Sequence, residues 1–344
     1  LNNLICLERI IYMNMKSWLA NLPASRKPMP ILSFPSSQLL GVSVYDLTHS
    51  AQLQSEGMKK IAERTDAAAA VSMMDLSVEA EAFGCEIMAA ENEIPTVIGA
   101  LITDQEEAEA LEIPPVGAAR TGIYIKAAQG AKQMLQDRPV LAGIIGPFSL
   151  AGRLMDVSEA LVNCIAEPDL VHTALKKTTA FLIEYAKAYK AAGIDGIVMA
   201  EPLSGLLSPE LEEEFSAPYV SEIISAVQDD EFIVIYHNCG PNTPHMTQSI
   251  SNNGASAFHF GDAVDLSLML EKMPKDKPVC GNISPSAEFL NGTPKSIYSA
   301  TSQLLEKCGK YENFVLSSGC DIPPASSWDN IDAFFKAAAD FNKK

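Results

Sequence analysis

Residues 233–240 read IVIYHNCG, in which four apolar residues are followed by a histidine, an asparagine, a cysteine and a glycine. Such a short apolar run is typical of a buried strand. A second stretch, FVLSSGCD at 314–321, has the same form near the C-terminus, with apolar residues that lead into a cysteine. We interpret both stretches as strands that end on a metal-ligating side chain, and the rest of the chain as the scaffold that brings these two ends together.

The residue types at these two strand ends are those that bind zinc. His237 and Cys239 lie two residues apart, so their side chains leave an extended chain on the same side. Cys320 would complete a set of one imidazole and two thiolates, and three protein ligands leave one position open for chemistry. Taken alone, the His-x-Cys pair is a weak signal, because a cysteine after a strand is more often a small buried hydrophobe. The predicted zinc site therefore depends on the two strand ends together.

Three further residues with possible metal-binding side chains lie in or next to predicted strands. Asp262 ends the strand that follows the His/Cys strand, which makes it the candidate for a fourth, displaceable zinc ligand. A solvated turn residue or a helix N-cap is an equally good interpretation of this aspartate. Cys280 and His259 lie within predicted strands, and we interpret both as core residues.

Strand-like and helix-like stretches alternate along the chain. This alternation predicts a parallel sheet, and eight units predict a closed (β/α)₈ barrel of the TIM type. A doubly wound sheet is the alternative. We expect residues 1–27, with a short helix at 15–22, to form an N-terminal helical extension, and residues 28–344 to form a single barrel domain. The predicted strands are 30–34, 66–74, 139–145, 194–200, 232–236, 255–260, 278–281 and 314–316.

In such barrels the chemistry lies where the strands end and the following loops begin. Asp75 and Glu201 each end a predicted strand, and we predict catalytic roles for them, either in binding a substrate or in orienting His237. Their alternative role is to cap the following helix. Polar residues at other strand ends, Ser36, Ser149 and Asn282, are the predicted substrate-binding residues.

The composition excludes several classes of protein. The chain has 344 residues, of which 47% are hydrophobic and 20% charged, which is ordinary for a globular protein. The net charge of −18 and the absence of a basic run argue against a nucleic-acid partner. The sequence contains no run of about 18 apolar residues, so no membrane span is predicted. It also contains no glycine-rich phosphate loop. Seven cysteines without disulfide-type spacing favour reduced thiols and a cytoplasmic location.

The beginning of the sequence, LNNLICLERIIYMN at 1–14, contains a short apolar run. It lacks the basic region and the small-residue cleavage site of a signal peptide, so we do not expect one. Met13 and Met15 are candidates for the true start of the chain.

From about residue 28 to its end, the sequence resembles the uroporphyrinogen decarboxylase superfamily. It is most similar to the cobalamin-dependent branch, the methylcobamide:coenzyme M methyltransferases. The resemblance implies a (β/α)₈ barrel, and its most specific block is the one nearest the C-terminus. The motifs that carry it are PMPILSFPS (28–36), MMDLSVEAEAFGC (73–85), GPFSLAGRLM (146–155), YHNCG (236–240), GDAVDL (261–266), GNISP (281–285) and LSSGCDIPP (316–324).

Two places favour the methyltransferase branch. The decarboxylases carry substrate-binding arginines after the first strand, whereas FPSSQLL at 34–40 has none, and Arg26 lies before that strand. The decarboxylases also carry a histidine where this chain has Cys320. The zinc ligands of the methyltransferases follow a His-x-Cys…Cys pattern, which falls here on His237, Cys239 and Cys320, with Asp262 at the acidic fourth position.

The resemblance implies that a methyl group passes from a methylated corrinoid, presented by a separate corrinoid protein, to a small thiol such as coenzyme M. Arg153 is then the candidate partner for the sulfonate of that thiol. The alternatives are porphyrinogen decarboxylation, a non-catalytic subunit that binds a corrinoid protein, and a zinc hydrolase that activates water. We rank the hydrolase last, because two thiolates make zinc a poorer Lewis acid. Homo-oligomer formation is left open.

Overall fold

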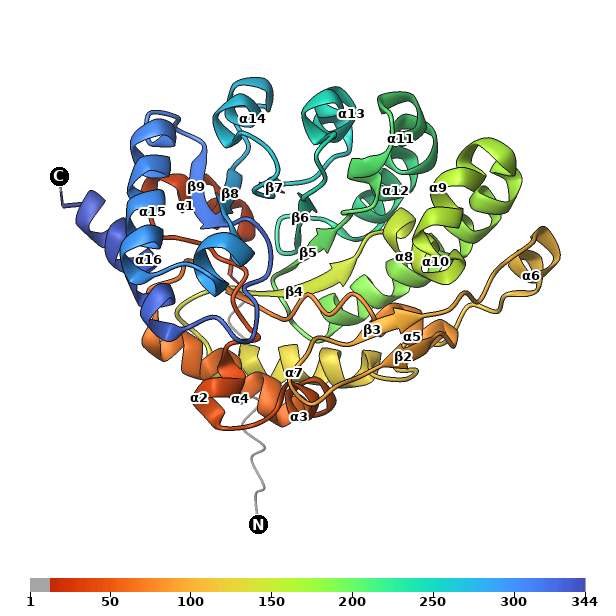
Figure 1. Cartoon of the computed structure of the whole chain (residues 1–344), viewed down its shortest axis with the longest axis horizontal. Coiled ribbons are helices and arrows are strands. Elements are labelled where there is room, and N and C mark those ends of the chain that lie inside the picture. The colour runs from red at the N-terminus through yellow and green to blue at the C-terminus, as the bar shows by residue number, and fades with distance from the viewer. Residues whose placement is uncertain (1–12, 344) are drawn as a thin grey trace, which may run out of the picture.

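The computed structural model describes residues 13–343. Within these residues a curved sheet of seven parallel strands is surrounded by helices, as Figure 1 shows, so the chain has a TIM-like α/β fold. The neighbouring strands of the sheet, in order, are β1 (Ala70–Val71), β4 (Val140–Ile145), β5 (Gly196–Ala200), β6 (Ile233–Asn238), β7 (Ala257–Phe260), β8 (Val279–Ile283) and β9 (Phe314–Ser318).

Helices follow the strands, and most of these helices cover the outside of the barrel. They are α1 (Met15–Ser25), α2 (Ser36–Leu40), α3 (Val44–His49), α4 (Ala51–Arg64), α5 (Val78–Phe83), α6 (Gln105–Ala110), α7 (Thr121–Met134), α8 (Pro147–Met155), α9 (Val157–Ala166), α10 (Pro168–Ala191), α11 (Pro209–Phe215), α12 (Ala217–Val227), α13 (Thr247–Asn252), α14 (Leu266–Lys272), α15 (Pro294–Cys308) and α16 (Trp328–Phe341), with short turns η1 (Ser204–Leu206), η2 (Thr243–His245) and η3 (Pro285–Leu290). A hairpin of β2 (Glu86–Met88) and β3 (Thr96–Ile98), together with α6, projects to one side of the barrel (Figure 1).

The sheet is not closed by a regular strand ladder, and the predicted strand at 30–34 is wrong as a regular strand. Extended chain occupies the gap between β9 and β1 instead. The amide of Met29 donates to the carbonyl oxygen of Leu316 in β9 (2.8 Å), and the amide of Ala68 donates to that of Pro28 (2.8 Å). Pro28 and Pro30 have no N–H group to offer a neighbouring strand, which explains why the ladder is interrupted here. We call residues 28–32 the closing segment.

The interior of the barrel is filled by small and medium apolar side chains, as the strand pattern predicts. Each fully buried valine, leucine, isoleucine or methionine among them stabilises the fold by about 1.5–3 kcal/mol. Helix α1 covers one end of the barrel, where Met15 and Leu22 are fully buried against the same cluster. The interior residues are Met29, Ile31, Ala69, Val71, Leu141, Val198, Ala200, Ile233, Ile235, Ala257, Cys280 and Val315.

Residues 147–166 form two helices, α8 and α9. Helix α8 begins at Pro147, because a proline at the first helical position needs no N–H partner. The chain then breaks at Asp156, which has a positive φ of 76° and whose side chain accepts a hydrogen bond from the amide of Ser158 to begin α9. The break places the C-terminal turn of α8 at the mouth of the barrel.

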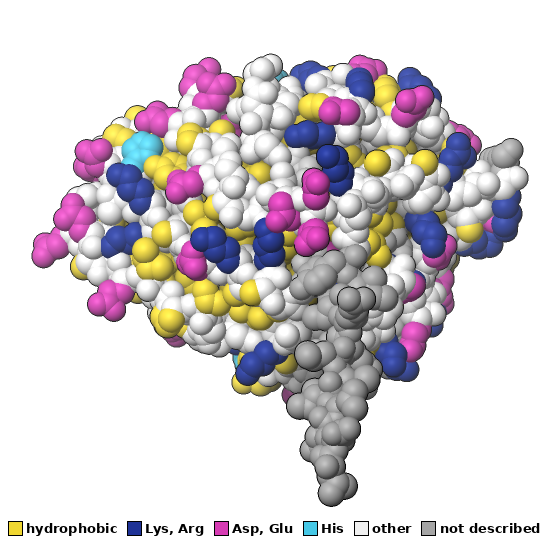
Figure 2. Space-filling model, turned by 180° about the vertical axis from the view of Figure 1, so that it is seen from behind, with side chains coloured by type: hydrophobic (Ala, Val, Ile, Leu, Met, Phe, Trp, Pro, Cys, Tyr) yellow, Lys and Arg dark blue, Asp and Glu magenta, His cyan; other side chains and the backbone are white. Residues whose placement is uncertain are grey.

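The surface carries both charge signs. On the described part of the face in Figure 2, acidic and basic side chains alternate with apolar ones. No helix within residues 13–343 combines the length and the apolar character needed to cross a membrane. The expectation about a signal peptide concerns residues that lie almost wholly outside the described part. The division into an extension (1–27) and a barrel (28–344) stays a prediction.

Candidate metal centre

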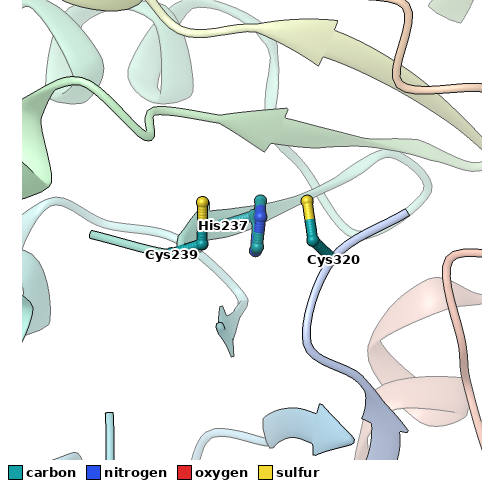
Figure 3. A group of neighbouring side chains, drawn as sticks. All are labelled: His237, Cys239 and Cys320. Carbon is teal, nitrogen blue, oxygen red and sulfur yellow. The ribbon is translucent and has the colours of Figure 1, made fainter. Parts of the chain in front are cut away.

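The carboxyl ends of β6 and β9 bring together the three residues of the predicted zinc set. One ligand atom from each of His237, Cys239 and Cys320 lies within 4.8 Å of the other two. Figure 3 shows the imidazole between the two sulfur atoms, with the side chains projecting in the same direction. His237 is fully buried and the two cysteines are partly buried. Residues 81 positions apart in the sequence therefore form one compact group of nitrogen and sulfur donors.

Asn238 holds the end of β6 in place. Its Nδ2 donates to the hydroxyls of Ser204 (3.0 Å) and Tyr236 (3.1 Å). Its Oδ1 accepts from the amide of Gly240 (2.9 Å) and from the hydroxyl of Thr243 (3.0 Å). Because Asn238 lies between two of the three clustered residues and is fully buried, these bonds fix the backbone that carries both.

Two glycines let the neighbouring loops approach the group closely. A methyl group at Gly240 would lie 2.5 Å from the Cα atom of Gly205, in the loop after β5. A methyl group at Gly261, directly after β7, would lie 2.4 Å from the Cβ atom of Cys239. A side chain at either position would displace the backbone on which Cys239 is mounted.

The ring of His237 has one engaged and one free nitrogen. Its Nδ1 lies 2.8 Å from Nδ1 of His259 and 3.3 Å from the carbonyl oxygen of His259. Its Nε2 is buried and has no hydrogen-bond partner anywhere in residues 13–343. A buried ring nitrogen without a partner is costly unless something binds it. This nitrogen fits a metal ligand.

The two thiols shift each other's pKa values in opposite directions. A hydrogen bond from Cys320 lowers the pKa of Cys239, although burial opposes that shift. Donation of this hydrogen bond, together with burial, raises the pKa of Cys320 to about 12. Thiolates are the form in which cysteine binds metals, and binding releases the thiol protons. One imidazole and two sulfurs are a donor set that zinc accepts.

Asp262 lies beside the group but is exposed. A methyl group at Gly319 would lie 2.7 Å from its Oδ1, and its charge acts on the Cys239 thiol. In the described part of the chain its carboxylate is not among the donor atoms gathered within 4.8 Å. Its role as a fourth ligand stays a prediction.

The two predicted catalytic carboxylates are buried and already hydrogen-bonded. Asp75 pairs with the guanidinium of Arg120 (2.5 Å) and accepts from the hydroxyl of Tyr124 (2.7 Å). Glu201 accepts from two amides in the first turn of α8, those of Phe148 (3.0 Å) and Ser149 (2.6 Å).

Burial raises the pKa of Glu201 from 4.5 to about 7. The hydrogen bonds of Glu201 cap α8, which precedes Glu201 in the sequence, whereas the alternative that the sequence left open was a cap of the following helix. Neither carboxylate is hydrogen-bonded to the His237 ring within residues 13–343; His259 occupies that place. The catalytic roles of Asp75 and Glu201 stay predictions.

A cavity of about 310 Å³ opens beside Cys239. Two of the predicted substrate-binding residues, Ser149 and Arg153, lie in its wall, and both belong to α8. The rest of the wall is mostly apolar and includes Leu203 and Leu206. The Nε of Arg153 is buried and has no partner in the part of the chain that the structure describes. The cavity therefore offers an anion-binding group next to a candidate metal ligand.

The other two predicted substrate-binding residues, Ser36 and Asn282, lie outside this wall. Ser36 is buried against α4, where a methyl group at Gly57 would meet its side chain. The Nδ2 of Asn282 donates to the carbonyl oxygens of Gly261 and Val264, both at 2.9 Å. Asn282 thus ties the end of β8 to the loop after β7.

Sequence reasoning missed three residues that support the group: Asn238, His259 and Ser317. His259 is buried as predicted, but it contacts the candidate ligand His237 and is not an isolated core histidine. The signal was present in the strand register, because His237 and His259 lie side by side on β6 and β7.

Comparisons with known proteins agree with this architecture. The model of a family described as uroporphyrinogen decarboxylase (URO-D) matches residues 25–341. The methylcobamide:CoM methyltransferase MtbA of Methanosarcina acetivorans is 26% identical over 271 residues, which cover 78% of each protein. A uroporphyrinogen decarboxylase of Coxiella burnetii is 26% identical over 287 residues, 80% of this chain and 78% of its own. The solved structure of a methyltransferase from Methanosarcina mazei has a TM-score of 0.83 at 23% identity, covers 96% of this chain and 99% of its own, and shows the same fold.

Proposed function

The chain belongs to the uroporphyrinogen decarboxylase (URO-D) family, and from that premise we propose that it is a zinc-dependent methyltransferase. It would move a methyl group from a protein-bound methylated corrinoid to a small thiol such as coenzyme M. The observation that carries the proposal is the group of His237, Cys239 and Cys320 at the mouth of the barrel. The name of the Methanosarcina acetivorans relative, a methylcobamide:CoM methyltransferase, supports the same choice.

Three side chains of this protein would hold the zinc ion: Nε2 of His237 and the thiolates of Cys239 and Cys320. When bound, zinc would keep an acceptor thiol in its thiolate form at neutral pH, where a free thiol with a pKa of about 8.5 is mostly protonated. We propose that Asp262 fills the remaining position until the acceptor arrives. It lies beside Cys239, and it is an exposed residue in a turn outside the helices and strands.

We propose that the cavity beside Cys239 binds the acceptor. Arg153 would pair with the anionic end of the thiol, and Ser149 would lie along it. The apolar wall keeps water away from the sulfur. In this proposal Glu201 acts indirectly, because it caps α8, the helix that carries Ser149 and Arg153. Asp75 holds the neighbouring loop through its pair with Arg120.

The reaction itself is a displacement at carbon. The acceptor sulfur donates an electron pair to the methyl carbon and forms the S–C bond. The Co–C bond breaks, and its electron pair stays on cobalt, which leaves as Co(I). The thiol proton passes to solvent. The protein must hold sulfur and methyl carbon about 3–3.5 Å apart and in line.

Two measurements on the purified full-length protein test the proposal. Metal analysis should find one zinc per chain, and Cys239→Ala and Cys320→Ala should both lose it. Cys280→Ala is the matched control, because Cys280 is buried inside the barrel and is not part of the group. Loss of zinc from all three variants would mean that general destabilisation, and not ligation, explains the result.

The second measurement is an anaerobic assay with methylcobalamin and a panel of thiols. We expect a thiol-dependent change from the methylcobalamin to the cob(I)alamin spectrum, fastest with a short anionic thiol. A zinc-containing protein that fails to demethylate the corrinoid with any thiol would refute the transferase assignment and favour a non-catalytic subunit that binds a corrinoid protein. A protein that binds no zinc would remove the basis of the proposal.

The decarboxylase relative from Coxiella burnetii keeps a second function open, the decarboxylation of a porphyrinogen. The stretch 34–40, which includes α2, has no arginine to hold substrate carboxylates. Conversion of uroporphyrinogen by the metal-free protein, followed by chromatography of the oxidised products, would establish this alternative. We expect no conversion.

A further inference from the structure

A chain of hydrogen bonds runs from His237 away from the candidate metal ligands and into the barrel. Nδ1 of His237 lies 2.8 Å from Nδ1 of His259. Nε2 of His259 lies 2.8 Å from the hydroxyl of Ser317 in β9. The Ser317 hydroxyl donates to the carbonyl oxygen of Met29 in the closing segment (2.7 Å). All the side chains in this chain of bonds are fully buried.

The far end of the chain fixes the direction of its bonds. A carbonyl oxygen can only accept, so the single hydroxyl proton of Ser317 is directed to Met29. The Ser317 oxygen must then accept from His259, and Nε2 of His259 must carry a proton. In a neutral imidazole this leaves Nδ1 of His259 as an acceptor.

The contacts of His237 itself also place a proton on its Nδ1. The carbonyl oxygen of His259 lies 3.3 Å from Nδ1 of His237, and it too can only accept. Nδ1 of His237 must therefore carry a proton, which it shares between this oxygen and Nδ1 of His259. The opposite arrangement needs a positively charged His259 that is buried without a carboxylate among its hydrogen-bond partners in residues 13–343, which is unfavourable.

From these two ends we infer that His259 and Ser317 are positioning residues, which fix the proton of His237 on Nδ1 and leave Nε2 as a bare lone pair for the metal. The inference rests on the metal site of the proposed function. Metal-ligating histidines usually donate their other N–H to a carboxylate, a carbonyl or water. Here a second imidazole takes that place, and it adds no negative charge beside the two thiolates.

The same chain of bonds makes the metal site depend on closure of the barrel. Met29, its last acceptor, belongs to the closing segment, and its own amide donates to Leu316 in β9. A shift of the closing segment would remove the acceptor of Ser317 and free the Ser317 proton to point at His259. His259 would then lose its fixed orientation, and His237 would keep only its contact with the carbonyl oxygen of His259.

The tautomer of His237 can be read directly in the unaltered protein. Full-length metal-free protein, labelled with ¹⁵N in its histidine rings, is examined by long-range ¹H–¹⁵N correlation spectra. We expect His237 to be protonated on Nδ1 and bare on Nε2, and His259 to show the reverse. A His237 protonated on Nε2 would overturn the inference, and this test does not depend on any variant folding.

Variants test whether the arrangement matters for the metal. His259→Leu removes the ring acceptor of the His237 proton and leaves only the backbone carbonyl oxygen of residue 259 at 3.3 Å, and we expect the zinc dissociation constant, measured by chelator competition, to rise by about 10–100-fold. His259→Asn places an amide oxygen near the former Nδ1 and should restore most of the affinity. Phe258→Leu is the matched control, because this neighbour on β7 packs in the outer core and should leave zinc affinity unchanged.

Ser317→Ala is the second route to the same test if His259→Leu does not fold. It removes the oxygen that accepts from His259, and we expect weaker zinc binding with a mixture of His237 tautomers. Unchanged zinc affinity in a folded His259→Leu or Ser317→Ala protein would refute the positioning role alone. Absence of zinc from the wild-type protein would refute the proposed metal site instead, so the two failures are distinguishable.

Discussion

At the scale of single residues, the candidate metal centre consists of donors that the sequence predicts and supports that it does not. His237, Cys239 and Cys320 follow apolar runs, and that pattern is visible in one dimension. The bond between His237 and His259 depends on which strands are neighbours and in what register, and single-strand patterns do not carry that information. Asn238 was missed for a similar reason, because its partners come from the loop after β5 and from its own turn.

Asn238 gives the first residue-scale prediction. Asn238→Ala leaves the buried Gly240 amide without its hydrogen bond, at about 1–3 kcal/mol, and takes one bond away from the Ser204 hydroxyl, which keeps its bond to the carbonyl oxygen of Glu201. We expect urea unfolding to show a loss of at least about 2 kcal/mol, together with weaker zinc binding. Asn242→Ala is the control, since Asn242 bonds only to loop carbonyls and is partly exposed. Equal losses in the two variants would contradict the special role of Asn238.

Arg153 gives the second residue-scale prediction, which concerns binding of the acceptor thiol. Arg153→Gln removes the positive charge from the cavity beside Cys239. A hydrogen bond to a charged group contributes about 1.5–3 kcal/mol, so the KM for 2-mercaptoethanesulfonate should rise by about 10–150-fold. The KM for neutral 2-mercaptoethanol should not change, nor should kcat for either thiol. Steady-state kinetics with both thiols provide the comparison, and an equal rise in the two KM values would remove Arg153 from the anion site.

At the scale of elements, sequence patterns predict the order of strands and helices well where local rules decide. Strands β6 and β9 begin at or next to the predicted starts. The closing segment is the exception. Its prolines and apolar residues are typical of a strand, yet its backbone bonds go to Leu316, Ile322 and Ala68 and do not form a regular ladder with one neighbouring strand. The sequence therefore predicts the position of this segment correctly, but the segment is not a regular strand.

A buried ion pair joins elements on the outside of the barrel and gives the element-scale prediction. Nζ of Lys132, on α7, lies 2.6 and 2.7 Å from the two carboxylate oxygens of Asp195, and Asp195 also accepts from the amide of Val140 at the start of β4. Asp195→Asn leaves the Lys132 ammonium buried without a counter-charge. We expect a loss of about 3–5 kcal/mol in the free energy of unfolding, measured by urea titration.

The exposed pair between Lys187 and Glu184 is the comparison for this prediction. Glu184→Gln should change the free energy of unfolding very little, because surface pairs contribute little. A loss in Asp195→Asn no larger than that in Glu184→Gln would show that α7 is not held by its ion pair. Restoration of stability in the double variant Lys132→Met with Asp195→Asn would support the assignment to an unpaired charge.

At the scale of the whole molecule, the fold buries acidic groups that the composition alone places on the surface. The net charge of −18 reads as an acidic exterior. Yet burial raises the pKa of Glu79, Glu201 and Glu212 to about 7, and it raises the pKa of Asp321 well above its usual range. Burial also holds the pKa of His259 well below 6.5. The sequence could not predict these five environments, because each arises from packing between distant segments.

These environments set how stability depends on pH, which is the whole-molecule prediction. Each of the three glutamates keeps its proton in the folded chain up to about pH 7, and the raised pKa of Asp321 acts in the same direction, whereas the unfolded chain releases these protons near pH 4–4.5. Unfolding therefore releases protons between these values, and stability falls as pH rises, by about 1.4 kcal/mol per pH unit for each such carboxyl. His259 acts in the opposite direction below about pH 6.5, because only the unfolded chain binds its proton there. Four carboxyls outweigh one histidine, so the net effect is a loss of stability.

We expect the metal-free protein to unfold at a lower urea concentration at pH 7 than at pH 5, with unfolding followed by circular dichroism. Glu212→Gln should make this dependence shallower by about 1.4 kcal/mol per pH unit, since one raised carboxyl is gone. Glu212 lies on α11, where it accepts from the Ser249 hydroxyl away from the metal ligands, so the change reports on burial and not on the site. Glu213→Gln, at the exposed neighbouring position, should leave the slope unchanged. A protein more stable at pH 7 than at pH 5 would mean that the ionised forms of these carboxyls are the ones the fold stabilises.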